Sequence, residues 1–584
     1  QGKTAGILIM GNSGQPGDDI SIRIRGISSP SGAQPLVIVD GVPVGGMDYL
    51  NPGDIASIEV LKDAASSAIY GTRGANGVIL VTTKQGRKGQ PATLSYDMYY
   101  GLQNPWKKMD LLNAREYAQF LNEAYYNDKL PLPFSQADLL KLSAGTDWQE
   151  EVFYRNAPVM NIQASLTSGT DKSSYSSSFS YFSQDGIVAR DKSNFERYTL
   201  RFNSNHDAFN DKIVIGQNLA YTHITRRGVT PNLEWGSPLG RAVNLDPVTP
   251  VRNEDGSWGT SGFASQEIVN PVAALNYLFA SSQVDKLVGN LYGELNLARG
   301  LKFKSSYSID LAYGMDDNYT PEYYITSNIK NDIPSVSKGL NRWFTWNLEN
   351  VISYYKSFGN HTVDALAGTT AQKYRFENLY GSKNTLLIDD YRFAYLDMAT
   401  NQLSAITAGG MDHTALLSYF GRVNYDFRNK YMATLIFRMD GSSKFGDSNK
   451  FGYFPSVSLG WNISDEYFME RFTFIDYLKL RAGWGRNGSD NIENFAYIST
   501  LSSFYRYTFG DDPVIYPGSA PERIANPELR WETTEQFNLG FNLNALRNRF
   551  SLIVDIYRKE TKDILIPNVP IPSLVGNNPP ASNA

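Results

Sequence analysis

The sequence predicts a mainly β protein: a large antiparallel β-barrel that crosses a membrane with its strands, preceded by a small α/β unit. Two observations support this prediction. From about residue 94 onward, apolar and polar residues alternate in segments of roughly ten residues or more, and short and long connections alternate between them. Alternation turns one face of a strand toward apolar surroundings and the other toward water. Connections of unequal length are typical of barrels in bacterial outer membranes.

The segment 431–440 shows the alternation clearly. Leu435 and Phe437 lie on one face of the expected strand, and Arg438 and Asp440 lie on the other. The same pattern recurs in the last two long segments of the chain. We therefore expect the apolar face to meet lipid and the polar face to line the interior of the barrel.

Residues 1–90 have a different pattern, which predicts a small α/β unit with little core of its own. Apolar runs between glycine-rich turns predict short strands, and a short helix is expected at about residues 63–70. Asp40 and Gly41 predict a tight turn directly after one of these runs. The expected strands are 20–25, 36–40, 55–61 and 78–83.

Residues 91–584 are expected to form the barrel, with about fifteen strands, as large barrels of this kind are built. The first long strand is predicted at about 92–102. Tight turns are expected at 168–171, 208–211, 298–300, 358–360, 428–430 and 546–548. Long connections are expected at about 103–158 (with an amphipathic helix near 111–127), 223–283, 314–338, 376–412 and 488–529. Because an odd number of strands does not close such a barrel, we expect the chain to stop partway round it.

The composition excludes several classes of protein. A net charge of −5 gives no electrostatic basis for binding nucleic acid. The chain has no cysteine, and its four histidines lack the spacing of metal ligands. No pair of carboxylates stands out as an acid and base. We therefore predict no catalytic residue, no metal and no cofactor, and a protein that is not an enzyme. The acidic pairs at 316–317, 389–390 and 511–512 are expected to be solvated turns, with calcium sites built from loop oxygens as the alternative.

Four motifs in the first 90 residues follow one another in a fixed order. They are SIRIRG at 21–26, PLVIVDGVP at 35–43, IEVLKDAA at 58–65 and AIYGTRGANGV at 68–78. Together they resemble the plug domain of SusC/RagA-type TonB-dependent outer-membrane transporters of Bacteroidetes. Segments 437–442, 451–456 and 526–532 are similar to barrel strands of the same family. The resemblance covers essentially the whole chain.

The resemblance implies a barrel of about 22 strands with the plug, here residues 1–90, inside its lumen. It also implies a SusD-like surface lipoprotein as a lid, the TonB–ExbB–ExbD complex as the energy source, and a place in the outer membrane among its lipids. The family's signal peptide, TonB box, first part of the plug and roughly seven further strands are expected to lie outside this sequence.

Two arginines of the plug predict a contact with the barrel wall. Arg23 and Arg25 lie on one face of a short expected strand and need carboxylate partners if the lumen buries them. Glu59 on the neighbouring strand is the expected partner, with Asp440 and Glu532 of the barrel as further candidates. These residues predict either a polar lock that force could undo or a static ion pair that fixes the plug's orientation.

Aromatic residues in the long connections are the candidates for contact with a substrate, because aromatic rings stack on the faces of sugar rings. Alternatively, they pack the loops together or contact the lid. The candidates are Trp235, Trp258, Tyr323, Tyr324 and Tyr505.

The resulting hypothesis is active import of an oligosaccharide across the outer membrane. An oligopeptide importer of the same fold is the first alternative, since both substrates use polar lumens and aromatic loops. A surface receptor or adhesin that does not transport is a second, although a plug is needed only where a pore must open. A soluble carbohydrate-active enzyme is a third, and it would require shorter strands and a pair of catalytic carboxylates.

Overall fold

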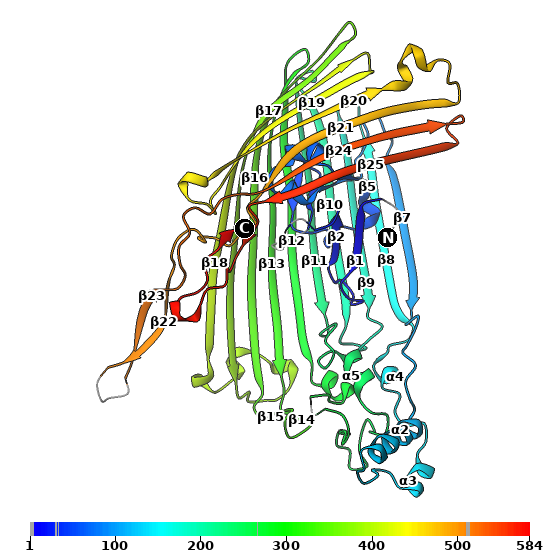
Figure 1. Cartoon of the computed structure of the whole chain (residues 1–584), viewed down its shortest axis with the longest axis vertical. Helices are drawn as coiled ribbons and strands as arrows, with labels where there is room; N and C mark the ends of the chain where they lie inside the picture. The colour runs from blue at the N-terminus through cyan, green and yellow to red at the C-terminus, as the bar shows by residue number, and fades with distance from the viewer. Residues whose placement is uncertain (1–4, 28, 30–31, 33, 266, 510–513) are drawn as a thin grey trace.

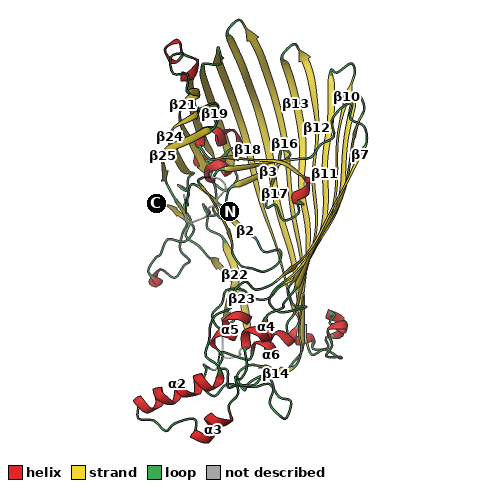
Figure 2. Cartoon of the chain, turned by 90° about the vertical axis from the view of Figure 1, so that its right-hand side faces the viewer, coloured by secondary structure: helices red, strands yellow, loops and turns green. Residues whose placement is uncertain are grey.

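A computed structural model describes residues 5–27, 29, 32, 34–265, 267–509 and 514–584. Its main feature is an antiparallel sheet of 15 strands in the order β25-β24-β21-β20-β19-β18-β17-β16-β13-β12-β11-β10-β9-β8-β7. The sheet is strongly curved, and the N-terminal unit lies on its concave side (Figures 1 and 2). The predicted number of strands, about fifteen, is confirmed.

The strands of this sheet lengthen toward its middle. Their bounds are β7 (Thr93–Gln103), β8 (Ala157–Gly169), β9 (Ser173–Asp185), β10 (Asn194–Ala208), β11 (Ile213–Arg227), β12 (Phe279–Ala298), β13 (Leu301–Thr320), β16 (Ser335–Phe358), β17 (His361–Asn384), β18 (Ile406–Phe427), β19 (Tyr431–Ser442), β20 (Phe451–Asn462), β21 (Ile475–Ser489), β24 (Glu532–Ala545) and β25 (Phe550–Lys562). The two edges of the sheet are β7 and β25.

Side chains alternate across the sheet as the sequence predicts. On β19, Leu435 is 57% exposed and Phe437 is 54% exposed, whereas Arg438 and Asp440 are buried. The buried face is the one that contacts the N-terminal unit. The exposed apolar face is the one that an outer-membrane barrel presents to lipid.

Short turns lie at one end of the sheet and long connections at the other (Figure 1). Several turn residues adopt the left-handed conformation, for example Arg428 and Asn429 between β18 and β19. In bacterial barrels the short turns face the periplasm and the long loops face outside. By this rule, the end of the sheet that carries the helices is the extracellular mouth.

The N-terminal unit, which we call the plug, contains a hairpin and a four-stranded sheet. The hairpin joins β1 (Ile7–Gly11) to β2 (Ile20–Ile24), and the sheet has the order β4-β3-β6-β5. The sheet strands are β3 (Leu36–Val39), β4 (Val42–Val44), β5 (Ile55–Leu61) and β6 (Val78–Thr83), with α1 (Ala64–Ser67) and 3-10 turns at Pro52–Asp54, Ala68–Tyr70 and Thr72–Asn76.

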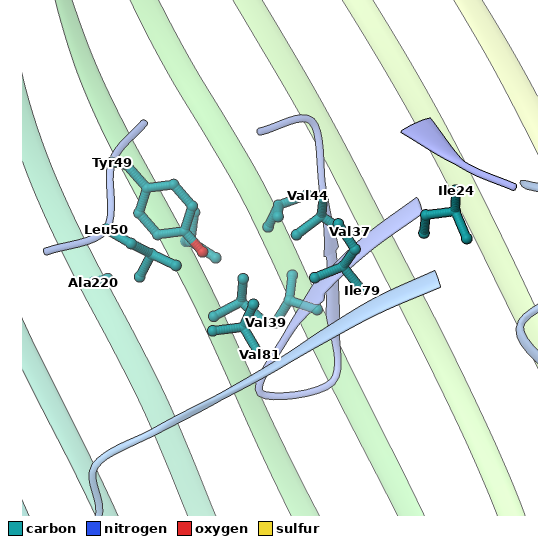
Figure 3. Close-up of a cluster of buried hydrophobic side chains, with 11 residues drawn as sticks. Ile24, Val37, Val39, Val44, Tyr49, Leu50, Ile79, Val81 and Ala220 are labelled. Carbon is teal, nitrogen blue, oxygen red and sulfur yellow. The ribbon is translucent and has the colours of Figure 1, made fainter. Parts of the chain in front are cut away.

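The plug's apolar core continues into the barrel wall. Val37, Val39, Ile79 and Val81 of the parallel pair β3 and β6 pack with other buried side chains, including Ala220 of β11 (Figure 3). The plug alone is small, so sharing its core with the wall increases the apolar area it buries. The predicted boundary between residues 90 and 91 lies between β6 and β7.

The extracellular loops carry most of the helices. These are α2 (Ala114–Asn127), α3 (Gln136–Lys141), α4 (Trp148–Val152), α5 (Pro238–Asn244) and α6 (Pro271–Asn276). Three two-stranded sheets complete the fold: β14 (Tyr323–Tyr324) with β15 (Lys330–Asn331), β22 (Leu501–Thr508) with β23 (Ile515–Pro521), and β26 (Leu565–Ile566) with β27 (Ser582–Asn583). No helix in the described part of the chain is long and apolar enough to cross a membrane.

Candidate functional site

The plug is held to the wall of the sheet by buried polar contacts as well as by its apolar core. At the centre of the interface, Arg201 of β10 donates a hydrogen bond to the Asp40 carboxylate, with 2.5 Å between the charged atoms. Both side chains are buried. Asp40 also accepts hydrogen bonds from the backbone N–H of Thr83 at 2.9 Å and from its hydroxyl at 2.6 Å. The carboxylate therefore links the β3–β4 turn, the end of β6 and the barrel wall.

The turn geometry explains why Asp40 reaches the wall. Asp40 has φ 48° and Gly41 has φ 86°, so the two residues connect β3 to β4 through a turn of two left-handed residues. Asp-Gly suits such a turn because aspartate tolerates the left-handed region and glycine enters it without strain. The predicted tight turn is confirmed. No local pattern in the sequence indicates the second role of Asp40, as an anchor to the wall.

A second anchor lies beside the first. The backbone carbonyl of Tyr49 accepts hydrogen bonds from Thr199 of β10 at 3.3 Å and Thr222 of β11 at 3.2 Å. The Tyr49 ring is fully buried, and the Lys286 ammonium lies 4.9 Å from its centroid. Burial raises the pKa of the Tyr49 phenol well above its ordinary value, and the carboxylate of Asp310 raises it further. The phenol is therefore neutral at physiological pH.

The plug also contacts the opposite part of the sheet. Arg438 of β19 donates to the carbonyl of Ile69 at 2.6 Å and pairs with Asp440 at 2.8 Å. Asn487 of β21 donates to the Ser67 hydroxyl at 3.0 Å. The bonds to Ile69 and Ser67 run from side chains of the wall to polar groups of the plug. An interface of this kind exchanges its bonds with water more easily than an apolar core does.

The predicted lock residues lie elsewhere on the plug. Arg25 donates to the Asn538 side chain at 2.6 Å, and its guanidinium lies 4.5 Å from the centroid of the Tyr557 ring. Arg23 is half-buried on β2, and Glu59 is exposed on β5. Within the described residues, neither arginine forms an ion pair with Glu59.

The expected carboxylate partners therefore need correction. Asp440 pairs with Arg438 on its own strand, and Glu532 accepts hydrogen bonds from Ser29 and from the backbone of Leu565. The physical reason is local: the backbone turns at Arg25, where φ is 55°, so strand alternation ends there. The arginine side chain is directed to an amide and a ring on the wall. Arg25 as part of a releasable lock stays a proposal.

At the extracellular mouth, the connections β11–β12 and β13–β16 form a cleft of about 750 Å³. Among the five candidate residues, Trp258 and Tyr324 line it. Tyr323 lies beside it and stacks on Tyr277, with 4.8 Å between ring centroids. Trp235, before α5, and Tyr505, on β22, do not line this cleft.

The two aromatic residues of the cleft differ in what they can contact. Trp258 is buried, donates its indole N–H to the Tyr277 hydroxyl at 3.0 Å and carries the Arg252 guanidinium 3.6 Å from its ring centroid. Tyr324 is 63% exposed. Trp258 thus supports the cleft, and Tyr324 offers an open ring. No group of three or more metal-ligating side chains occurs in the described ranges.

Comparison with protein families gives two matches. Residues 1–78 match the TonB-dependent receptor plug domain, and residues 135–584 match the TonB-dependent receptor-like β-barrel. The chain is 32% identical to the TonB-dependent receptor SusC of Bacteroides thetaiotaomicron over an alignment 615 residues long, which covers 99% of this chain and 58% of that protein. It is also 32% identical to the TonB-dependent receptor P3 of Formosa agariphila, covering 99% of this chain and 56% of the relative.

Solved structures show the same fold. The RagAB peptide importer in its closed-closed state matches with a TM-score of 0.87 and 23% identity, covering 100% of this chain and 67% of that one. The siderophore receptor PirA from Acinetobacter baumannii is more distant, with a TM-score of 0.54 and 15% identity over 97% of this chain and 68% of that one.

The fold and the plug interface define an outer-membrane β-barrel of the plugged type. The chain belongs to the TonB-dependent receptor family, and it is similar to the SusC protein of that family over 99% of its own length. The predicted family, fold class and outer-membrane location are thereby confirmed. The chain spans little more than half the length of the SusC and P3 relatives.

Proposed function

We propose that this protein imports a nutrient oligomer across the outer membrane with energy from the TonB–ExbB–ExbD complex. The observation that supports import most strongly is the plug on the concave side of the sheet, held by hydrogen bonds and ion pairs. Such contacts hold a barrier in place at rest and exchange with water when force is applied. A receptor or adhesin that only binds has no use for a removable barrier.

An oligosaccharide is the proposed substrate. The described lining of the mouth cleft combines aromatic rings with neutral hydroxyl and amide groups, the residue types that contact sugar faces and sugar hydroxyls. An oligopeptide is the second candidate, because the RagAB structures that share this fold are those of a peptide transporter. Those structures are less than 25% identical to this chain, so the likeness supports a shared fold and not a shared substrate.

A surface lipoprotein of the SusD type is the proposed partner at the mouth. The loop that contains α2 and α3 extends beyond the ends of the strands (Figures 1 and 2). It exposes large apolar side chains, including Trp106, Phe120, Tyr126 and Leu140. An exposed apolar surface of this kind marks a site of protein interaction. We expect the lid to cover this loop.

Uptake of labelled oligosaccharides and oligopeptides into cells with and without TonB tests the proposal. We expect TonB-dependent uptake of one class of oligosaccharide, together with binding of that class in calorimetry of the solubilised full-length protein and its lipoprotein. TonB-dependent uptake of peptides alone would show that the substrate is a peptide, and the proposed import would still stand. Binding without any TonB-dependent uptake would contradict import.

The lid surface has its own test. Phe120→Asp with Leu140→Asp places two charges on the exposed apolar loop, so co-purification of the lipoprotein should fall while the unfolding temperature stays unchanged. Lys129→Asp, a charge change on the same loop without loss of apolar surface, is the control. Undiminished co-purification of the double variant would place the lid elsewhere.

A further inference from the structure

The mouth cleft has an imbalance of charge. Its described lining contains neutral polar residues from both loops, such as Asn253, Ser257, Thr260 and Thr326. Of the described lining residues, Arg252 alone is charged. The cleft therefore offers a cation and no anion, a combination that favours a ligand with an acidic group.

The Arg252 side chain is held in position. The central carbon of its guanidinium lies 3.6 Å from the Trp258 ring centroid, and Nη1 donates to the carbonyl of Gly256 at 2.7 Å. Trp258 is itself fixed by Tyr277. No described residue accepts a hydrogen bond from Nε or Nη2 of Arg252. An arginine that is oriented by stacking and retains free donors is well suited to bind a carboxylate through two hydrogen bonds.

An open aromatic surface lines the same cleft. Tyr324 is largely exposed, and the β14–β15 hairpin that carries it is held by the stacking of Tyr323 on Tyr277. The same Tyr277 fixes Trp258, so one residue supports both sides of the cleft. The volume of about 750 Å³ lies within the range of small-molecule sites, about 300–1,000 Å³.

We infer that this cleft binds an acidic sugar, a uronate unit of an oligosaccharide, with its carboxylate on Arg252 and a sugar ring on Tyr324. The inference rests on the proposed function, because it specifies the class of oligosaccharide that the importer captures. A neutral sugar would occupy the aromatic surface without using the arginine. A peptide would supply a carboxylate only at its end or on an acidic side chain, and a ring for Tyr324 only where it carries an aromatic residue or a proline.

Calorimetry of the solubilised full-length protein with two trisaccharides tests the inference. The probes are a galacturonate trisaccharide and the galactose trisaccharide with the same linkage. We expect the galacturonate to bind the unaltered protein about tenfold more tightly, the size of one charge-assisted pair. Arg252→Gln should remove this preference and leave galactose binding unchanged. Arg252→Lys keeps the charge but loses the planar fork, so it should restore only part of the preference.

Variants of Tyr324 test whether the effect of the arginine substitution is specific or reflects a general change in the structure of the loop. Tyr324→Ala should weaken binding of both trisaccharides by about tenfold, since stacking contributes to both. Tyr324→Phe, which keeps the ring, should bind them like the unaltered protein. Tyr467→Ala, at an exposed tyrosine in the short connection between β20 and β21, is the matched control and should change neither affinity.

Three results would overturn the inference: equal affinity for the two trisaccharides, an unchanged preference in Arg252→Gln, or tighter binding of an acidic tripeptide than of galacturonate. TonB-dependent uptake is measured separately on the same variants. If the Arg252 and Tyr324 variants take up oligosaccharide as well as the unaltered protein does, the cleft is not the binding site, and the proposed import still stands. If binding depends on Arg252 and Tyr324 but no TonB-dependent uptake occurs, the proposed import is wrong, and the inference about the cleft still stands.

Discussion

At the scale of single residues, the plug's attachment depends on a few buried polar side chains. Asp40 satisfies three donors at once, from Arg201 and from the backbone and hydroxyl of Thr83. A buried carboxylate is tolerated only when it is paired and hydrogen-bonded in this way. Removing one partner leaves the remaining charge uncompensated.

Arg201→Gln should therefore destabilise the plug's attachment strongly. The expected loss is about 3–5 kcal/mol, because the Asp40 charge stays buried without its cation. Thermal unfolding in detergent and ion leakage across planar bilayers measure the effect. The control is Arg558→Gln, which breaks an exposed pair with Glu560 and should cost at most about 1 kcal/mol. Equal stability of the two variants would show that the ion pair does not hold the plug.

Tyr49 allows a prediction of the opposite sign. Its buried hydroxyl has no hydrogen-bond partner in the described structure. Tyr49→Phe should therefore raise the stability by about 1 kcal/mol, since an unsatisfied buried hydroxyl is unfavourable by that order. Tyr49→Ala should lower it by about 3–5 kcal/mol because it leaves a cavity. Chemical unfolding of the three proteins decides the matter, and a destabilised Tyr49→Phe would mean that the hydroxyl has a partner.

At the scale of elements, the long strands were predictable and the loop structure was not. Alternation over many residues identifies a strand that separates lipid from water, and it placed Leu435 outward and Asp440 inward. The hairpin β22–β23 within the connection 488–529 was missed, because both of its faces are largely exposed and its sequence lacks clear alternation. The strand β1 was also missed.

The helix α1 approaches the wall through glycines of β21. A Cβ atom at Gly485 would lie 3.0 Å from the Cβ of Ala64, closer than side chains normally pack. Gly485→Val should therefore push α1 away from β21. We expect the overpacking to destabilise the protein by about 1–3 kcal/mol and to increase ion leakage across planar bilayers. Gly293→Val on β12 is the control, because its Cβ would meet open space. Unchanged ion leakage in Gly485→Val would mean that α1 accommodates the larger side chain without leaving the wall.

At the scale of the whole molecule, the sequence predicted a plug inside a barrel but not which residues join them. Asp40 and Arg201 are 161 positions apart, and Ser67 and Asn487 are 420 apart. No local pattern determines such pairings, since they follow from how the curved sheet surrounds the plug. Of the residues predicted to contact a substrate, Trp258 and Tyr324 line the mouth cleft, whereas Trp235 and Tyr505 lie elsewhere, and the contact itself stays a prediction.

Import as proposed requires the plug to leave the β21 wall. Ala65 of α1 and Gly483 of β21 permit a direct test, because a Cβ at Gly483 would lie 3.7 Å from that of Ala65. This distance suits a disulfide, whose Cβ atoms lie about 3.5–4.5 Å apart. The chain has no cysteine of its own to interfere. Ser458→Cys with Gly483→Cys, at 3.6 Å, is the matched control, since it joins two strands of the wall.

The measurement is substrate uptake by cells that carry Ala65→Cys with Gly483→Cys, before and after reduction. We predict that the oxidised protein binds substrate but does not import it, and that reduction restores import. The control pair should import in both states. Full import by the oxidised plug-to-wall pair would contradict the account, because the plug would then open the path without leaving β21.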